Sequence, residues 1–133
     1  MSDASDMPCA ALAEAVERCR LPSASFRHRQ HVQLGWYYLD TRPLLDAVLQ
    51  FGRVVARFAE HHGAHGKYDE PLTMAYMLLI EERRQLAPEA DFSTFASLNA
   101  DLLADGQEVL RRRLGRTEQS TRAALPERNG PAA

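Results

Sequence analysis

The chain has 133 residues, a hydrophobic share of 45% and a formal net charge of −2. This length suits one domain, the hydrophobic share excludes an intrinsically disordered chain, and the near-neutral charge argues against a nucleic-acid partner. The longest apolar run, residues 74–80, is too short to span a membrane. Residues 1–8 are acidic and polar and contain no secretory signal, so we expect a cytoplasmic protein.

The spacing of apolar residues predicts an all-α fold, a single helical bundle of five to six helices over residues 8–125, with loose termini at 1–7 and 126–133. The predicted helices cover residues 8–20, 26–40, 43–62, 72–85, 92–103 and 107–114. Asp69 or Glu70 should cap the fourth helix, and Asp91 the fifth. The fourth is apolar nearly all round, so we expect it in the centre of the bundle.

The second helix carries two histidines on its apolar face. At helical spacing this face contains His28, His31, Val32, Gly35, Trp36 and Leu39. Gly35 lowers the helix propensity by roughly 1 kcal/mol relative to Ala, so we expect another helix to approach closely there.

All five histidines lie between residues 28 and 65. His28 and His31 begin the second helix, whereas three more end the third helix, namely His61, His62 and His65. Tyr68, Asp69 and Glu70 then lead into the fourth helix. If the second and third helices pack antiparallel, as a short connection favours, these side chains converge at one end of the bundle.

This convergence predicts a metal site. Two histidines and one carboxylate are a usual ligand set for non-haem iron or catalytic zinc. The candidate ligands are His28, His31, Asp69 and His62. The two-histidine spacing is less specific than an HExxH motif, and histidines at a helix C-terminus are commonly surface residues that favour the helix dipole. For His28 and His31 this simpler interpretation is weaker, because buried imidazole nitrogens need hydrogen-bond partners.

Two segments together form a longer pattern, Phe26-x-His28-x-x-His31-Val32-x-Leu34-x-Trp36 and later Tyr68-x-Glu70-x-Leu72-Thr73. The pattern resembles that of a family of small bacterial proteins to which no activity is assigned. The resemblance implies an all-helical fold and points to His28, His31 and Glu70. The sequence departs from the family pattern in having Gly35 for alanine, Asp69 for histidine and Pro71 for threonine. Asp69 then either replaces that histidine as an oxygen ligand, or the site is altered.

We therefore predict a small-molecule enzyme with a histidine and carboxylate site, dependent on iron or zinc, with no nucleotide cofactor indicated. The catalytic candidates are Glu70, Asp69 and Tyr68, and the candidate pocket walls are Trp36, Tyr76 and Met74. One alternative is a metal-free acid–base enzyme, such as a dehydratase, isomerase or cyclase. The other is a protein without turnover, which binds a small molecule or buries a face in a homodimer.

Overall fold

The computed structural model describes residues 7–64 and 69–124, with side chains described as far as residue 115. These ranges form α1 (Cys9–Glu17), the 3-10 turn η2 (Ser23–Ser25), α2 (His28–Thr41), α3 (Leu44–His61), α4 (Glu70–Gln85), α5 (Phe92–Leu98), α6 (Ala100–Ala104) and α7 (Gly106–Ala124). They contain no strand, which confirms the all-α class, and no helix among them is long and apolar enough to cross a membrane. The termini predicted to be loose lie, apart from Met7, outside the described residues.

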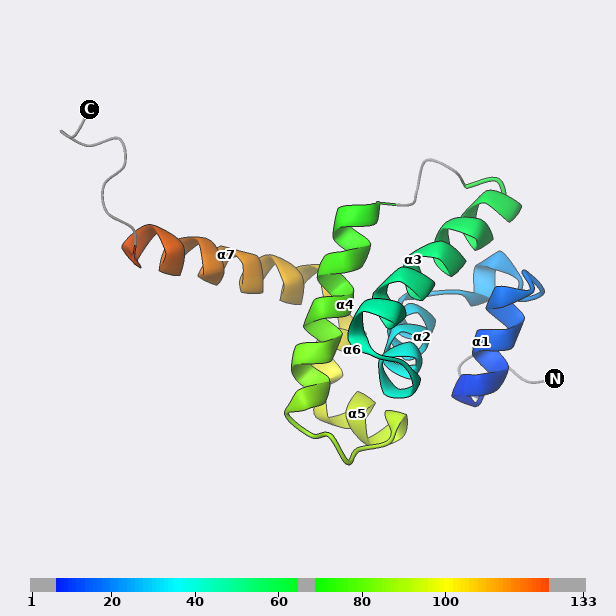
Figure 1. The fold of residues 1–133 in the computed structure, drawn as a ribbon, viewed down its shortest axis with the longest axis horizontal. Helices are drawn as coiled ribbons and strands as arrows, with labels where there is room; N and C mark the ends of the chain where they lie inside the picture. Colours follow the sequence, from blue (N-terminus) through cyan, green and yellow to red (C-terminus); the bar gives the residue numbers. More distant parts are fainter. Residues whose placement is uncertain (1–6, 65–68, 125–133) are drawn as a thin grey trace.

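The central helix of the bundle is α2. It contacts α1, α3, α4, α5 and α6, whereas α7 runs outward from the body (Figure 1). The prediction that the fourth helix is central is wrong, because the outer face of α4 exposes Leu72, Met74 and Leu78 by 37%, 44% and 54%. The helices packed against α4 therefore leave part of its apolar surface exposed.

The close approach predicted at Gly35 is confirmed. A Cβ atom on Gly35 would lie 2.9 Å from Met77 Sδ and 3.1 Å from Ile80 Cδ1. Both neighbours belong to α4, so the missing side chain lets α4 pack directly on α2.

Two predicted N-caps are also confirmed. Asp69 Oδ1 accepts a hydrogen bond from Leu72 N at 2.9 Å, and Asp91 Oδ1 accepts one from Thr94 N at 2.9 Å. Because Asp69 is the cap, α4 begins at Glu70, two residues before the predicted start.

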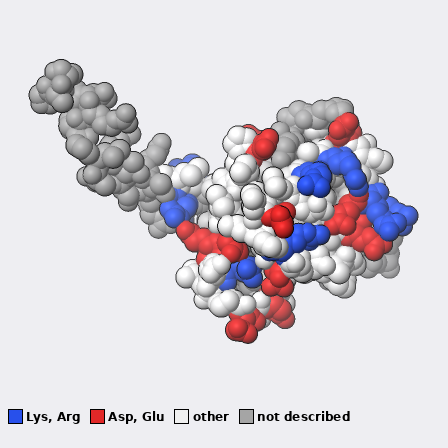
Figure 2. All heavy atoms as spheres, in the orientation of Figure 1, with Lys and Arg blue, Asp and Glu red and all other residues white. Residues whose placement is uncertain are grey.

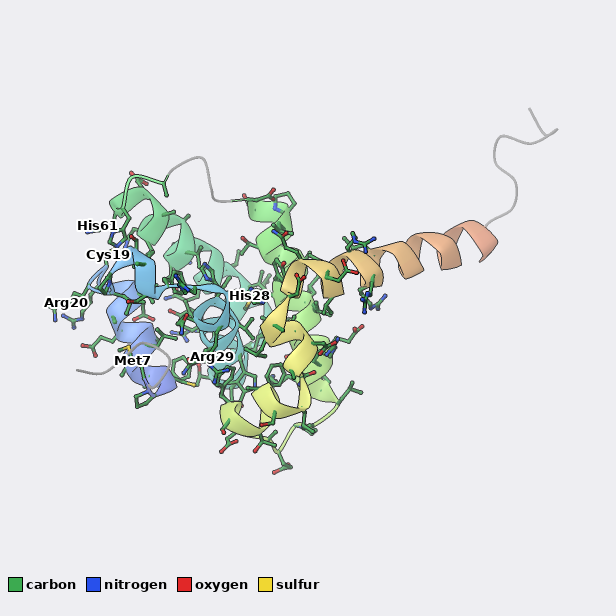
Figure 3. The ribbon with its side chains drawn as sticks, turned by 180° about the vertical axis from the view of Figure 1, so that it is seen from behind. Met7, Cys19, Arg20, His28, Arg29 and His61 are labelled. Carbon is green, nitrogen blue, oxygen red and sulfur yellow. The ribbon has the colours of Figure 1, made fainter. Side chains whose placement is uncertain are left out.

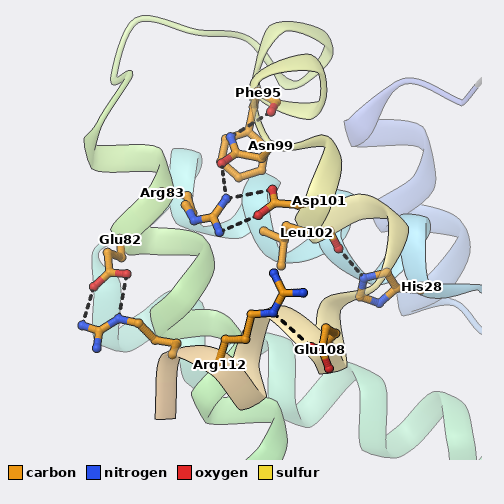
Figure 4. A network of polar contacts seen from close by, with 10 residues as sticks. His28, Glu82, Arg83, Phe95, Asn99, Asp101, Leu102, Glu108 and Arg112 are labelled. Carbon is orange, nitrogen blue, oxygen red and sulfur yellow. Dashed lines mark hydrogen bonds and ion pairs between the residues drawn. The ribbon is translucent and has the colours of Figure 1, made fainter. Parts of the chain in front are cut away.

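The single helix predicted over residues 92–103 is wrong, because the chain breaks at Asn99 into α5 and α6. Asn99 Nδ2 donates to Phe95 O at 2.9 Å, and its Oδ1 accepts from Arg83 Nη1 at 2.8 Å (Figure 4). Arg83 also binds both carboxylate oxygens of Asp101, at 3.1 and 3.0 Å. Both polar groups of the Asn99 side chain are thus hydrogen-bonded at the break, and the described residues contain seven α-helices, not five to six.

Acidic and basic side chains are interspersed on the face that Figure 2 draws. On α7, Arg111 and Arg112 both pair with Glu108, at 2.7 and 3.0 Å. The arginines at the start of α7 therefore form part of a mixed-charge helix surface.

Candidate functional site

A cavity of about 530 Å³ opens between the start of α2, α3, the first half of α4 and the junction of α6 with α7. This volume is in the range of small-molecule sites. Its walls are mainly apolar, and its polar side chains are those of His28, His31, Asp69, Thr73, Tyr76, Asp105 and Gln107. Three of the four predicted ligands, His28, His31 and Asp69, thus line a single cavity together with one predicted pocket wall, Tyr76.

His28 lies where α2 meets the start of α7 (Figure 3). Its Nε2 is 2.8 Å from Leu102 O (Figure 4). A carbonyl oxygen can only accept, so Nε2 carries the hydrogen and donates it. In the neutral ring this places the unshared electron pair on Nδ1.

Gly106 makes room for the His28 ring. A Cβ atom at this position would lie 2.6 Å from His28 Nε2 and 2.9 Å from Tyr76 Cε1, both impossibly close. The preceding residue, Asp105, caps α7 by accepting from Glu108 N at 3.1 Å. The helices predicted over residues 92–103 and 107–114 left Asp105 and Gly106 between them and did not indicate a cavity wall. A glycine at the first position of a helix, where it is less common than after the last, is the only signal that the sequence offers.

His31 is held by contacts on two sides. Its Nδ1 donates to Arg27 O at 2.8 Å, and its ring stacks on Phe26 with centroids 3.8 Å apart. Burial lowers the pKa of His31 below the ordinary 6.5, although the hydrogen bond to Arg27 opposes this shift; His28 adds to the lowering. The ring is therefore neutral at pH 7, with its unshared pair on Nε2, which has no hydrogen-bond partner among the residues described.

Tyr76 has the opposite electrostatic character. Burial raises the pKa of its hydroxyl above the ordinary 10.0, and the nearby Asp105 raises it further. Its ring centroid lies 6.1 Å from that of His28. Tyr76 therefore keeps its proton at neutral pH and can donate a hydrogen bond into the cavity.

Several predicted site residues lie away from the cavity lining. Trp36 is buried against Phe92 and Phe95, with centroid distances of 5.7 and 6.4 Å. Glu70 is exposed at the first position of α4, and Met74 is 44% exposed on the same helix. Tyr68 and His65 lie outside the described residues.

His62 is at the same end of the bundle as His31 but does not line the cavity. Its ring packs on Phe58, at 4.4 Å between centroids, and Phe58 packs on Phe26, at 4.9 Å. Two apolar rings therefore connect His62 to His31. His61 is exposed at the end of α3 (Figure 3).

The described part of the chain brings no three His, Cys, Asp or Glu side chains together in a group that could hold a metal ion. The cavity lining instead contains two imidazoles, two carboxylates and one phenol. In comparisons with known proteins, no family model, curated protein or solved structure matches the chain.

Proposed function

We propose that the cavity binds a small, largely apolar molecule, on which His31 acts as a general base and Tyr76 as a hydrogen-bond donor. The carrying observation is that one cavity contains two titratable groups with oppositely shifted pKa values, His31 lowered and Tyr76 raised. Such a pair fits a base whose nitrogen is unprotonated at neutral pH and a hydrogen-bond donor that keeps its proton there.

The proposed step is proton abstraction next to a polarised oxygen. His31 Nε2 takes a proton from a substrate carbon, the C–H electron pair forms a double bond, and negative charge develops on the carbonyl oxygen. The Tyr76 hydroxyl donates a hydrogen bond to that oxygen. The resulting imidazolium is stabilised because Nδ1–H already donates to Arg27 O. This chemistry belongs to isomerisations, dehydrations and cyclisations.

The metal-dependent form of the prediction has less support from the donor set. His28 and His31 offer two nitrogen ligands, but the described residues add no third ligand in range. A catalytic zinc or iron site needs three. We therefore derive no step through a metal, and the assay below includes EDTA as its test.

The experiment measures exchange of deuterium from D₂O into the α-positions of benzylacetone, an apolar ketone, by proton NMR. We expect the protein to accelerate the exchange over buffer, with and without EDTA. His31→Gln should lose about a hundredfold of that acceleration, as expected for a general base, and Tyr76→Phe about tenfold.

The matched control is His62→Gln, the same change on an exposed histidine outside the lining. It should exchange the ketone like the unmodified protein. If the unmodified protein gives no acceleration, or if His31→Gln retains it, the acid–base proposal is refuted. Binding of the ketone without exchange would support the alternative of a protein without turnover.

A further inference from the structure

The charges that line the cavity restrict its ligand. Asp69 and Asp105 line it as the residues that cap α4 and α7. No lysine or arginine side chain lines it within the described residues. Carboxylates and phosphates are usually bound by such cations, and here they would meet two negative charges instead.

Each aspartate keeps one oxygen for a ligand. Asp69 Oδ1 accepts from Leu72 N at 2.9 Å, and Asp105 Oδ1 accepts from Glu108 N at 3.1 Å. The second oxygen of each has no hydrogen bond among the described residues. Because both carboxylates are exposed, we place them at the rim of the cavity.

The inner part of the cavity also accepts hydrogen bonds. The largely buried His31 keeps the unshared pair of Nε2 without a hydrogen-bond partner among the described residues. The rings of Phe26, Phe58 and Tyr76 belong to the same lining. An ammonium group donates hydrogen bonds, so His31 Nε2 in the interior and the carboxylates at the rim favour the same kind of ligand.

We infer that the molecule bound in this cavity carries a protonated amine beside its apolar body, and no carboxylate or phosphate. The inference rests on the proposed function, because it assumes that the cavity is the substrate site. The inference adds a substrate class to that proposal: the substrate is an amine that also carries the carbonyl group on which His31 and Tyr76 act.

The test compares three probes with the same phenyl body: phenethylamine, phenethyl alcohol and hydrocinnamate. Binding to the full chain is measured by calorimetry at neutral pH and low salt. We expect the amine to bind about tenfold more tightly than the alcohol, and the carboxylate more weakly than either. Equal or tighter binding of the alcohol or the carboxylate would overturn the inference.

The variants Asp69→Asn and Asp105→Asn should each weaken amine binding about threefold and leave alcohol binding unchanged. Asparagine caps a helix about as well as aspartate, so both variants should fold. Asp91→Asn is the matched control, since Asp91 caps α5 with the same hydrogen bond but does not line the cavity. An amine affinity that neither cavity variant weakens also overturns the inference.

The two proposals fail in different ways. If the alcohol binds as tightly as the amine while ketone exchange still depends on His31, only the amine class is wrong. If none of the three probes binds and the ketone does not exchange, the cavity is not a substrate site and both proposals fail.

Discussion

Replacing Gly106 with alanine tests whether the contact between His28 and the start of α7 stabilises the fold. The new Cβ would lie 2.6 Å from His28 Nε2 and 2.9 Å from Tyr76 Cε1. Neither ring can stay where it is, so His28 must leave its 2.8 Å hydrogen bond with Leu102 O.

Three effects set the magnitude. Alanine favours the helix by about 0.8 kcal/mol relative to glycine. Overpacking a filled site costs about 1–3 kcal/mol, and a lost hydrogen bond costs about 1 kcal/mol. The balance is a destabilisation of about 2 kcal/mol for Gly106→Ala, which urea denaturation at neutral pH would measure directly.

Gly115→Ala is the control within the same helix. A Cβ atom on Gly115 would meet nothing within 4 Å, so this variant should gain about 0.5–1 kcal/mol from helix propensity alone. The NMR signal of the His28 Cε1 proton should shift in Gly106→Ala and not in Gly115→Ala. If the two variants were equally stable, or the His28 signal stayed in place, the reasoning would be refuted.

Two further predictions concern pH and the break between α5 and α6. Burial lowers the pKa of His31, so the unfolded chain binds this proton more tightly, and stability falls as the pH drops through about 6.5 towards the folded pKa. Between about pH 7.5 and 5.5 the urea midpoint of the unmodified protein and of His62→Gln should therefore decrease more than that of His31→Gln. Equal decreases in all three proteins would contradict this prediction. Asn99→Ala should cost about 1–3 kcal/mol in the same assay, because it removes the bonds to Arg83 and Phe95 O, whereas exposed Ser97→Ala should stay within about 0.5 kcal/mol. Equal stability of those two variants would mean that the side-chain bonds of Asn99 do not stabilise the fold.

Local chemistry made most of the fold predictable. The starts of α3, α4 and α5 are determined by prolines at 43 and 71 and by aspartates at 69 and 91. Each of these residues acts on the backbone within one helical turn, so its effect can be predicted from the neighbouring sequence. The break at Asn99 was not predictable, because Arg83, which donates a hydrogen bond to the Asn99 amide oxygen, lies on another helix. The central position of α2 was missed for a similar reason: a helix with Gln30 and Gln33 buried does not look apolar in sequence.

The candidate site was predictable in part. Helical spacing placed His28 and His31 on one face, and the cap position of Asp69 brought it to the same cavity. Helical spacing does not show which side chains lie between two others, so the Phe26 and Phe58 rings that connect His31 to His62 were not predicted. The contribution of Asp105 and Gly106 depends on how α6 and α7 dock, which no local pattern encodes.

The bond from His28 to Leu102 O joins residues 74 positions apart. A free imidazole exchanges its hydrogen between two nitrogens, so in a chain whose C-terminal third has not yet docked, this ring has no fixed donor face. When α6 packs against α2, the bond to Leu102 O keeps the hydrogen on Nε2 of His28. The position of the hydrogen on this imidazole at the start of α2 is thus determined by a backbone carbonyl of α6, and it becomes fixed only when α6 packs against α2.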